Sequence, residues 1–207
     1  MIRSPIIPRL VPPSSRLRLP EYFRIAALSL VVLLGCEAGS SRLLAEGKPL
    51  VANPGFLFDD NYDGWPDGWI GGKGLSWHLN KAPELSYVRL KVEEPGKSPV
   101  FYKEIPLSAT VRSVDFLIQA RAADVVGGDE SWHDARLQLE FRTLDKAKLR
   151  PTPKPLVVSR TGSTDWKSFS GTLEVPPDAA TLVIVGALFY CQAGTLDIGR
   201  IELNAHD

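Results

Sequence analysis

Cysteine is scarce in this sequence, whose 207 residues contain only Cys36 and Cys191. Cys36 belongs to an N-terminal segment that we expect to be removed or lipidated, which excludes a disulfide from the mature chain. Cys191 follows the apolar segment 182–190 and is expected to be buried as a small hydrophobic residue. The sequence therefore predicts a globular domain held by one hydrophobic core, and 44% of its residues are hydrophobic.

An excess of positive charge is also absent. Lys and Arg together number 24, as do Asp and Glu, which gives a formal net charge of +0. Five arginines and a single acid lie within residues 1–35, so the remainder of the chain is mildly acidic. A nucleic-acid-binding surface normally needs a basic stripe, and the sequence shows none after the N-terminal segment. We therefore expect no nucleic-acid partner.

Catalytic motifs are missing as well. The sequence contains no G-x-S-x-G, H-E-x-x-H, P-loop or Rossmann fingerprint. Ser131, His133 and Asp134 lie too close in sequence for a triad, whose members come from separate elements. His78 and His206 stand alone, and a lone histidine is usually satisfied or solvated. We expect that the protein is not an enzyme, and a small hydrolase with two converging carboxylates is kept as a third hypothesis.

Residues 1–36 have the features of an export signal. An arginine-rich start leads into the apolar segment 25–34, which matches a signal-peptide core and is too short for a membrane helix of ~20 residues. The LLGC sequence that ends at Cys36 resembles the bacterial lipobox, which implies a lipid on this cysteine. Ordinary cleavage near Ala38 or Ala45 is the alternative. We expect an exported protein, either a cell-envelope lipoprotein whose membrane contact is this lipid anchor, or a periplasmic or secreted protein.

After residue 45, apolar and polar residues begin to alternate with a period of two. Apolar and polar residues alternate over 88–93 and 137–142, which is typical of strands with one buried face. Further candidate strands are 100–105, 113–124, 166–175, 181–190 and 195–203, with shorter ones near Val51 and over 75–79. Segment 181–191 is apolar on both faces and is expected to be a central strand. No apolar stripe of helical period is present outside the signal.

These patterns predict an all-β fold, an antiparallel two-sheet β-sandwich of jelly-roll type. We expect the sandwich to span residues 49–205. Residues 37–48 are polar and rich in glycine and serine, and they are expected to form a short linker after the signal.

Five motifs along the predicted sandwich occur in a recognisable order. They are NPGF (53–56), DGWPDGW (63–69), WHDARLQLEF (132–141), TDWKSFSGTLEVPPDAATLVIV (164–185) and GTLDIGRIEL (194–203). Together they resemble the galactose-binding-like jelly rolls that include secreted carbohydrate-binding modules, over roughly residues 50–205. The resemblance implies a glycan-binding role, although the group includes domains without one. Many members hold a structural calcium with an N-x-G-F-E opening and a closing acidic pair, whereas here Leu57 replaces the Glu and Ile198 follows Asp197.

The segment FDDNYDGWPDGW, residues 58–69, is an acidic, turn-rich loop. Asp59, Asn61 and Asp63, followed by glycine, fit the start of a calcium loop, and Asp67 stands where a water-mediated ligand would lie. Ile70 occupies the position of the closing Glu, so we expect a weak, structural calcium site. The alternative is an Asx-rich turn with solvated carboxylates.

Tryptophans in polar loops are candidates for stacking against a sugar ring, with neighbouring carboxylates binding its hydroxyl groups. The predicted carbohydrate-binding residues are Trp65, Trp77, Asp129, Glu130, Trp132 and His133. Trp69 and Trp166 are expected to pack in the sandwich core. The sequence thus predicts an exported, non-catalytic protein that binds a carbohydrate or polysaccharide. The alternative is a structural or protein-interaction domain of the cell envelope.

Overall fold

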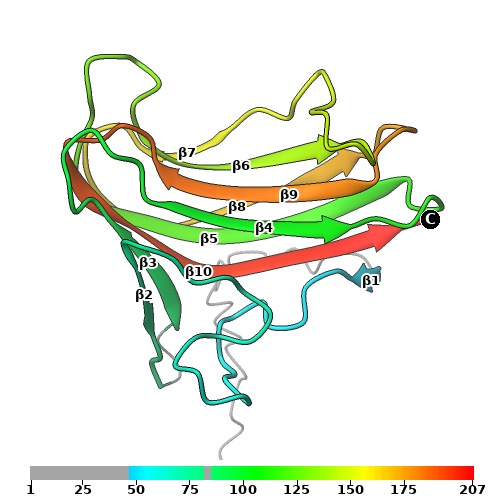
Figure 1. The fold of residues 1–207 in the computed structure, drawn as a ribbon, viewed down its shortest axis with the longest axis horizontal. Helices are drawn as coiled ribbons and strands as arrows, with labels where there is room; N and C mark the ends of the chain where they lie inside the picture. Colours follow the sequence, from blue (N-terminus) through cyan, green and yellow to red (C-terminus); the bar gives the residue numbers. More distant parts are fainter. Residues whose placement is uncertain (1–46, 82–84) are drawn as a thin grey trace, which may run out of the picture. The chain divides into compact units, whose positions relative to one another are not determined.

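The computed structural model describes residues 47–81 and 85–207, and these residues form strands and no helix (Figure 1). None of the described residues therefore belongs to a helix that could cross a membrane. The predicted signal segment, Cys36 and nearly all of the predicted linker lie outside the described residues.

Ten strands pair in antiparallel fashion to form two sheets (Figure 1). Their bounds are β1 Lys48–Pro49, β2 Leu75–His78, β3 Tyr87–Lys91, β4 Val100–Pro106, β5 Ser113–Val126, β6 Ala135–Arg142, β7 Leu156–Ser159, β8 Gly162–Glu174, β9 Thr181–Leu188 and β10 Ala193–His206. The first sheet, sheet A, has the order β2-β3-β10-β5-β8, and β1 also pairs with β10. The second sheet, sheet B, has the order β4-β9-β6-β7. The predicted all-β, two-sheet antiparallel sandwich is confirmed.

Alternation along the strands explains why the sheets face each other. In β5, Val114, Phe116 and Ile118 are buried, whereas Asp115 and Leu117 between them are partly exposed. Successive side chains of a strand point to opposite faces, so this pattern gives sheet A one apolar face toward sheet B and one polar outer face. Strand β9 lies between β4 and β6 and is largely buried, as its apolar sequence predicted.

The core between the sheets consists mainly of branched aliphatic and aromatic side chains. Phe101, Leu137, Ile184 and Ile198 are fully buried in it. Cys191 is also fully buried, as predicted, and this burial raises the pKa of its thiol to about 11. The thiol is therefore protonated near neutral pH and packs as a small hydrophobic group.

The long connection between β1 and β2 contributes an aromatic cluster to this core. The Phe56 ring lies 4.9 Å from that of Trp69 and 6.2 Å from that of Phe101 on β4, and the last two rings are 5.1 Å apart. Trp69 is buried, which confirms its predicted core position, and its indole Nε1 donates to the Asn53 carbonyl at 2.8 Å. The connection is thus anchored in the sandwich even though its sequence is polar.

Asn53 is the buried polar residue that shapes the start of this connection. Its side-chain Oδ1 accepts the Leu57 amide at 2.8 Å, and its Nδ2 donates to the Phe58 carbonyl at 2.9 Å. Asn53 is only 3% exposed, so water does not replace these partners easily. The side chain therefore substitutes for the backbone pairing that an irregular segment lacks.

Replacing Asn53 with alanine should lower the free energy of unfolding by about 1–3 kcal/mol, because the Leu57 amide and the Phe58 carbonyl lose their partner in a partly buried position. Urea denaturation followed by tryptophan fluorescence measures this change. The control is Asn61→Ala, which removes an exposed asparagine from the same connection and should alter stability by less than about 0.5 kcal/mol. Equal effects of the two substitutions would show that the Asn53 side chain does not stabilise this connection.

Candidate functional site

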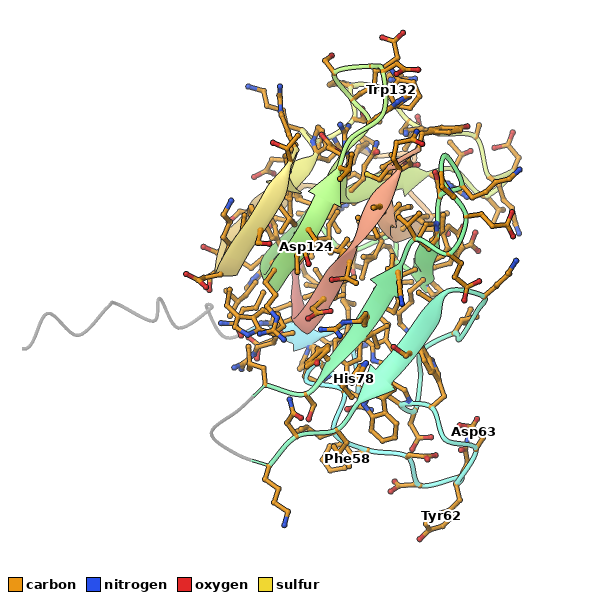
Figure 2. The ribbon with its side chains drawn as sticks, turned by 90° about the vertical axis from the view of Figure 1, so that its left-hand side faces the viewer. Phe58, Tyr62, Asp63, His78, Asp124 and Trp132 are labelled. Atoms are coloured by element: carbon orange, nitrogen blue, oxygen red, sulfur yellow. The ribbon has the colours of Figure 1, made fainter. Side chains whose placement is uncertain are left out.

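The sequence-predicted site residues lie at opposite ends of the described domain. Trp132 lies at one end, whereas Tyr62 and Asp63 of the acidic loop lie at the other (Figure 2). The predicted carbohydrate-binding residues therefore do not form one site. The β5–β6 loop contains Asp129, Glu130, Trp132 and His133. Trp65 belongs to the connection before β2, and Trp77 belongs to β2 itself.

Trp65 and Trp77 both pack against the hydrophobic core. Trp77 donates its indole Nε1 to the Phe56 carbonyl at 2.9 Å, which fixes the ring on the inner side of β2. The Trp65 ring lies against Gly71, where an added Cβ would be 3.3 Å from the ring. Among these two and Trp132, only Trp132 has an exposed side chain, with 46% of the residue exposed.

Trp132, His133 and Tyr190 form an aromatic corner at the loop end of the sandwich. The Trp132 and Tyr190 rings are 5.5 Å apart and meet at 89°, and His133 lies 4.3 Å from Trp132 and 5.2 Å from Tyr190. Tyr190 comes from the β9–β10 loop and is 48% exposed. The corner thus joins two loops that are far apart in the sequence, and it presents two large rings to solvent.

A buried ion pair supports this corner. Asp134 is fully buried, and its carboxylate accepts bonds from Arg136, including one from Nη2 at 2.6 Å. The same Nη2 donates to the Trp132 carbonyl at 3.0 Å, so the loop backbone is tied to the pair. On the other loop, the Tyr190 amide donates to the Ser98 hydroxyl at 2.8 Å. Tyr190 has a positive φ of 46°, a conformation that its neighbours must maintain.

The acidic loop uses its carboxylates to bind its own backbone. Asp59 accepts the amides of Asp63 and Gly64, at 3.1 and 3.0 Å. Asp63 accepts the Trp65 amide at 2.8 Å, and Asp67 accepts the Asp60 amide at 2.8 Å. These are the contacts of an Asx-rich turn.

Calcium binding at this loop stays a prediction, because a carboxylate that accepts an amide still has free lone pairs. Asn61 also takes part in the loop, since its Oδ1 accepts the Asp63 amide at 3.0 Å. Within the described residues, no group of three or more His, Cys, Asp or Glu side chains is arranged to hold a metal ion. A calcium ion would therefore need additional ligands from backbone carbonyls or water.

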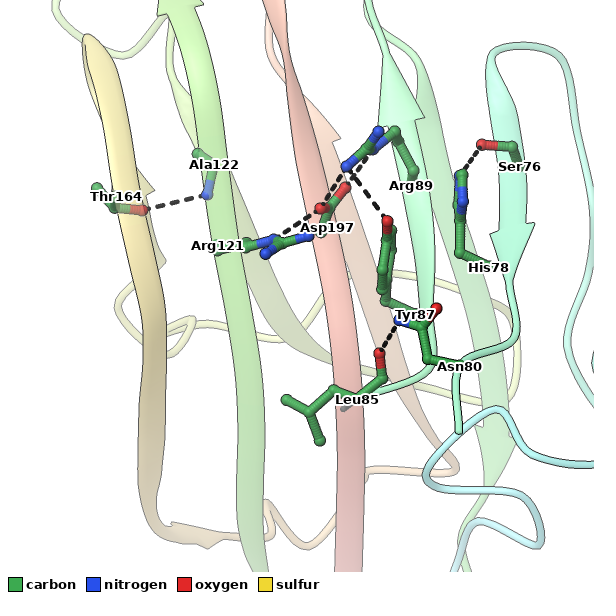
Figure 3. Close-up of polar contacts among 10 residues, drawn as sticks. All are labelled: Ser76, His78, Asn80, Leu85, Tyr87, Arg89, Arg121, Ala122, Thr164 and Asp197. Atoms are coloured by element: carbon green, nitrogen blue, oxygen red, sulfur yellow. Dashed lines mark hydrogen bonds and ion pairs between the residues drawn. The ribbon is translucent and has the colours of Figure 1, made fainter. Parts of the chain in front are cut away.

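A second polar and aromatic cluster lies on the outer face of sheet A (Figure 3). Asp197 on the central strand β10 is only 2% exposed and is flanked by two arginines. Arg89 on β3 donates Nε and Nη2 to the two carboxylate oxygens at 2.6 and 2.8 Å, and Arg121 on β5 donates Nε to Oδ2 at 2.9 Å. Bonds to this carboxylate hold the pKa of Arg89 above its usual value.

Aromatic rings surround these arginines. The Arg121 guanidinium carbon lies 4.7 Å from the Trp166 ring centre and 5.2 Å from that of Tyr87. His78 stacks on Tyr87, with 4.6 Å between ring centres. Burial, followed by the positive charge of Arg89, lowers the pKa of His78, so this imidazole is neutral near pH 7.

The predicted core position of Trp166 is wrong, because its ring lies on the outer face of sheet A. Register irregularities occur in β8 beside Trp166 and in β10 beside Gly199. A Cβ on Gly199 would lie 2.9 Å from the Trp166 ring, so the glycine makes room for the indole. Trp166 lies in the same alternating set as the exposed Ser168 and Ser170, whereas Phe169 in the opposite set packs against the core. The spacing along β8 therefore already indicated the outer face, and the expected core position rested on the size of the side chain.

Sequence reasoning missed Tyr190 and the whole outer-face cluster. Arg89 and Arg121 occupy ordinary polar positions of alternating strands, which is also the pattern of a solvated surface. The one available signal was Asp197, an acid between Leu196 and Ile198 in what proves to be a central strand. A buried acid of this kind normally requires a cationic partner.

The predicted calcium site can be tested by calorimetry in millimolar calcium and in a chelator. With a Kd of ~10⁻⁴ to 10⁻³ M, as in extracellular modules, calcium at ten times Kd should stabilise the domain by about 1.4 kcal/mol and raise its melting temperature. Asp63→Asn should abolish the response while keeping an oxygen that can accept the Trp65 amide. If the parent protein melts at the same temperature in calcium and in chelator, the loop does not bind calcium and is an Asx-rich turn only.

Comparison with known proteins identifies the fold through solved structures alone. No protein-family model matches the sequence, and no curated protein matches it. The enzymatically active domain of tailspike protein 4 from bacteriophage CBA120 matches with a TM-score of 0.50 and 14% identity, over 76% of this chain and 21% of that chain. The protein thus spans about a fifth of the tailspike chain.

Carbohydrate-binding modules are also among the matched structures, as the sequence resemblance predicted. TmCBM61, solved with β-1,4-galactotriose, matches with a TM-score of 0.47 and 13% identity, over 77% of this chain and 100% of that chain. The CBM22-1 xylan-binding domain of Paenibacillus barcinonensis Xyn10C matches with a TM-score of 0.43 and 12% identity, over 77% of this chain and 95% of that chain. Identities this low concern the fold, and the described geometry confirms that fold as an all-β sandwich of two antiparallel sheets.

Proposed function

We propose that this protein binds carbohydrate, without chemical turnover, at the aromatic corner of Trp132, His133 and Tyr190. The observation that supports this most directly is the pair of exposed, mutually perpendicular rings of Trp132 and Tyr190. A monomeric protein rarely leaves large aromatic side chains together at a loop end without a ligand to cover them. One ring can pack on the apolar face of a pyranose while the other contacts its edge.

Polar groups for the sugar hydroxyls lie in the same loop. Asp129 and Glu130 are exposed, and both precede the corner by a few residues. The Glu130 carbonyl accepts the His133 amide at 2.9 Å, which keeps this acidic turn against the aromatic side chains. Aromatic walls combined with a few polar groups are the usual composition of small-ligand sites.

The corner is also fixed before any ligand arrives. The Asp134–Arg136 pair holds one loop, and the bond from the Tyr190 amide to Ser98 holds the other. A site whose side chains are already ordered loses less conformational entropy when it binds. The arrangement therefore favours direct glycan recognition over a flexible surface that orders on contact.

The alternative function is that of a structural or protein-interaction domain of the cell envelope. It would use the same exposed rings against a protein surface, where tryptophan and tyrosine are also frequent anchors. The two functions differ in their ligand, so binding assays with polysaccharides distinguish them.

Affinity electrophoresis in gels that contain xylan, β-1,4-galactan or soluble β-glucan tests the proposal. At least one polymer should retard the protein, and Trp132→Ala or Tyr190→Ala should weaken binding at least tenfold, which equals about 1.4 kcal/mol. Phe58→Ala is the matched control, because it removes an exposed aromatic side chain at the opposite end (Figure 2). The proposal fails if no polymer retards the parent protein, or if the control weakens binding as much as the corner variants do.

We further propose that the protein is exported and carries a lipid on Cys36. The support is the apolar segment 25–34 followed by a lipobox-like sequence. Mass spectrometry of the membrane fraction should show a mature chain that starts at Cys36 with added lipid mass, and Cys36→Ser should release the protein from membranes. An unchanged mature mass and unchanged membrane association in the variant would rule out lipidation.

A further inference from the structure

Arg121 on the outer face of sheet A has hydrogen-bonding capacity that the described residues do not use. Its Nε donates to Asp197, and within the described residues no protein group accepts a bond from its Nη1 or Nη2. Its side chain is only 36% exposed, so these donors are partly withdrawn from water. A planar guanidinium offers such a pair of donors in the geometry that matches a carboxylate.

The guanidinium of Arg121 is held in a defined position. The rings of Trp166 and Tyr87 lie at 4.7 and 5.2 Å, and Asp197 binds its Nε. Asp197 is itself held by two bonds from Arg89, so it is a fixed support. An arginine with few accessible conformations loses little entropy when it binds a ligand.

A surface depression of about 340 Å³ lies beside this guanidinium. Its lining includes Arg89, Arg121 and Asp197, the small side chains Ala122 and Ala123, and three polar residues of β8, namely Ser163, Thr164 and Asp165. Thr164 Oγ1 accepts the Ala122 amide at 3.1 Å, so its hydroxyl hydrogen is left to donate to a ligand (Figure 3). The volume is at the small end of the range for ligand sites, which suits a single sugar residue.

We propose that this depression binds the uronate residue of an acidic glycan, with the sugar carboxylate on the Nη atoms of Arg121. Asp197 and Asp165 balance the charges of the two arginines across the whole lining, so an anionic group is favoured locally, by the Nη donors of Arg121 rather than by net charge. Asp165 in the same lining is exposed and can accept hydroxyl hydrogens, and the Thr164 hydroxyl can donate. A ligand must therefore offer both a carboxylate and neighbouring hydroxyl groups, and a uronate has both.

This site is a different surface from the Trp132–Tyr190 corner, and the inference stands whether or not the corner binds neutral glycans. The corner lies on loops at the end of the sandwich, whereas the Arg121 depression lies over β3, β10, β5 and β8. The two sites also differ in chemistry, because the corner offers aromatic faces and acids, and the depression offers a guanidinium.

Calorimetric titration with trimers of galacturonate, glucuronate and mannuronate, each paired with its methyl ester, tests the inference. At least one acid should bind at least tenfold more tightly than its ester, and its affinity should fall as sodium chloride rises from about 50 to 500 mM, because ionic contacts at a surface are screened. In the parent protein, the Arg121 side-chain nitrogen resonances should shift during the titration. This NMR readout does not depend on any variant.

Variants then distinguish the effect of the paired guanidinium donors from the effect of the positive charge. Arg121→Lys keeps a positive charge but lacks the paired donors, and it should weaken uronate binding at least tenfold. Arg112→Lys is the matched control, since Arg112 is exposed and donates to the Ala109 carbonyl outside the depression. Trp132→Ala should leave uronate binding unchanged, which separates this site from the corner.

Four results would overturn the inference. The first is the absence of binding by every uronate trimer, and the second is equal affinity for an acid and its ester. The third is full uronate affinity in a folded Arg121→Lys variant, with folding checked by its melting temperature. The fourth is tighter binding of an acidic peptide than of any uronate, which would assign the guanidinium to a protein carboxylate instead.

Discussion

Asp197 carries a carboxylate that is almost completely buried on the central strand of sheet A, and the outer face of this sheet depends on it. Burying a charge is unfavourable unless it is paired and hydrogen-bonded. Here Arg89 binds both oxygens and Arg121 binds one of them, so the carboxylate is satisfied from two neighbouring strands. Without Asp197 the two guanidinium groups would repel each other, and Arg121 would lose the contact that aligns it with its aromatic neighbours.

The bulges of β8 and β10 act together with this ion pair. Both bulges lie beside the contact between Trp166 and Gly199, where the absence of a Cβ lets the indole lie close to the backbone. The ring then covers Arg121 from one side while Tyr87 covers it from another. A sheet surface that would otherwise be a row of solvated polar side chains thus becomes a rigid site with defined donors.

The irregular connections of the sandwich obtain their order from polar groups rather than from sheet pairing. In the connection before β2, Asn53 and several aspartates bind backbone amides or carbonyls that no strand partner reaches. In the β5–β6 loop, the buried Asp134–Arg136 pair has the same effect. Polar side chains, from the buried Asn53 and Asp134 to the exposed Asp63, thus order the connections at both ends of the sandwich.

Much of the fold could be predicted from the sequence, because the alternation of apolar and polar residues along a strand is a local signal. The alternation over 113–124 and 137–142 corresponds to β5 and β6, and the apolar segment 181–190 corresponds to the central strand β9. The short strand β7, Leu156–Ser159, was not predicted, since it has too few residues to show a period and follows a proline-rich loop. Its place depends on pairing with β6.

The candidate sites were predicted less completely, for a related reason. The sequence by itself determined that Trp132 stands among polar residues, that Trp69 is surrounded by turn residues and that Cys191 follows an apolar strand. Only the tertiary structure decided that Tyr190 meets Trp132, that Trp77 packs against the core, and that Trp166 lies against Arg121. Local spacing reports which face of a strand a residue occupies, whereas a site is made by residues from several strands and loops. The register shifts and long-range contacts that bring those residues together leave no local pattern in the sequence.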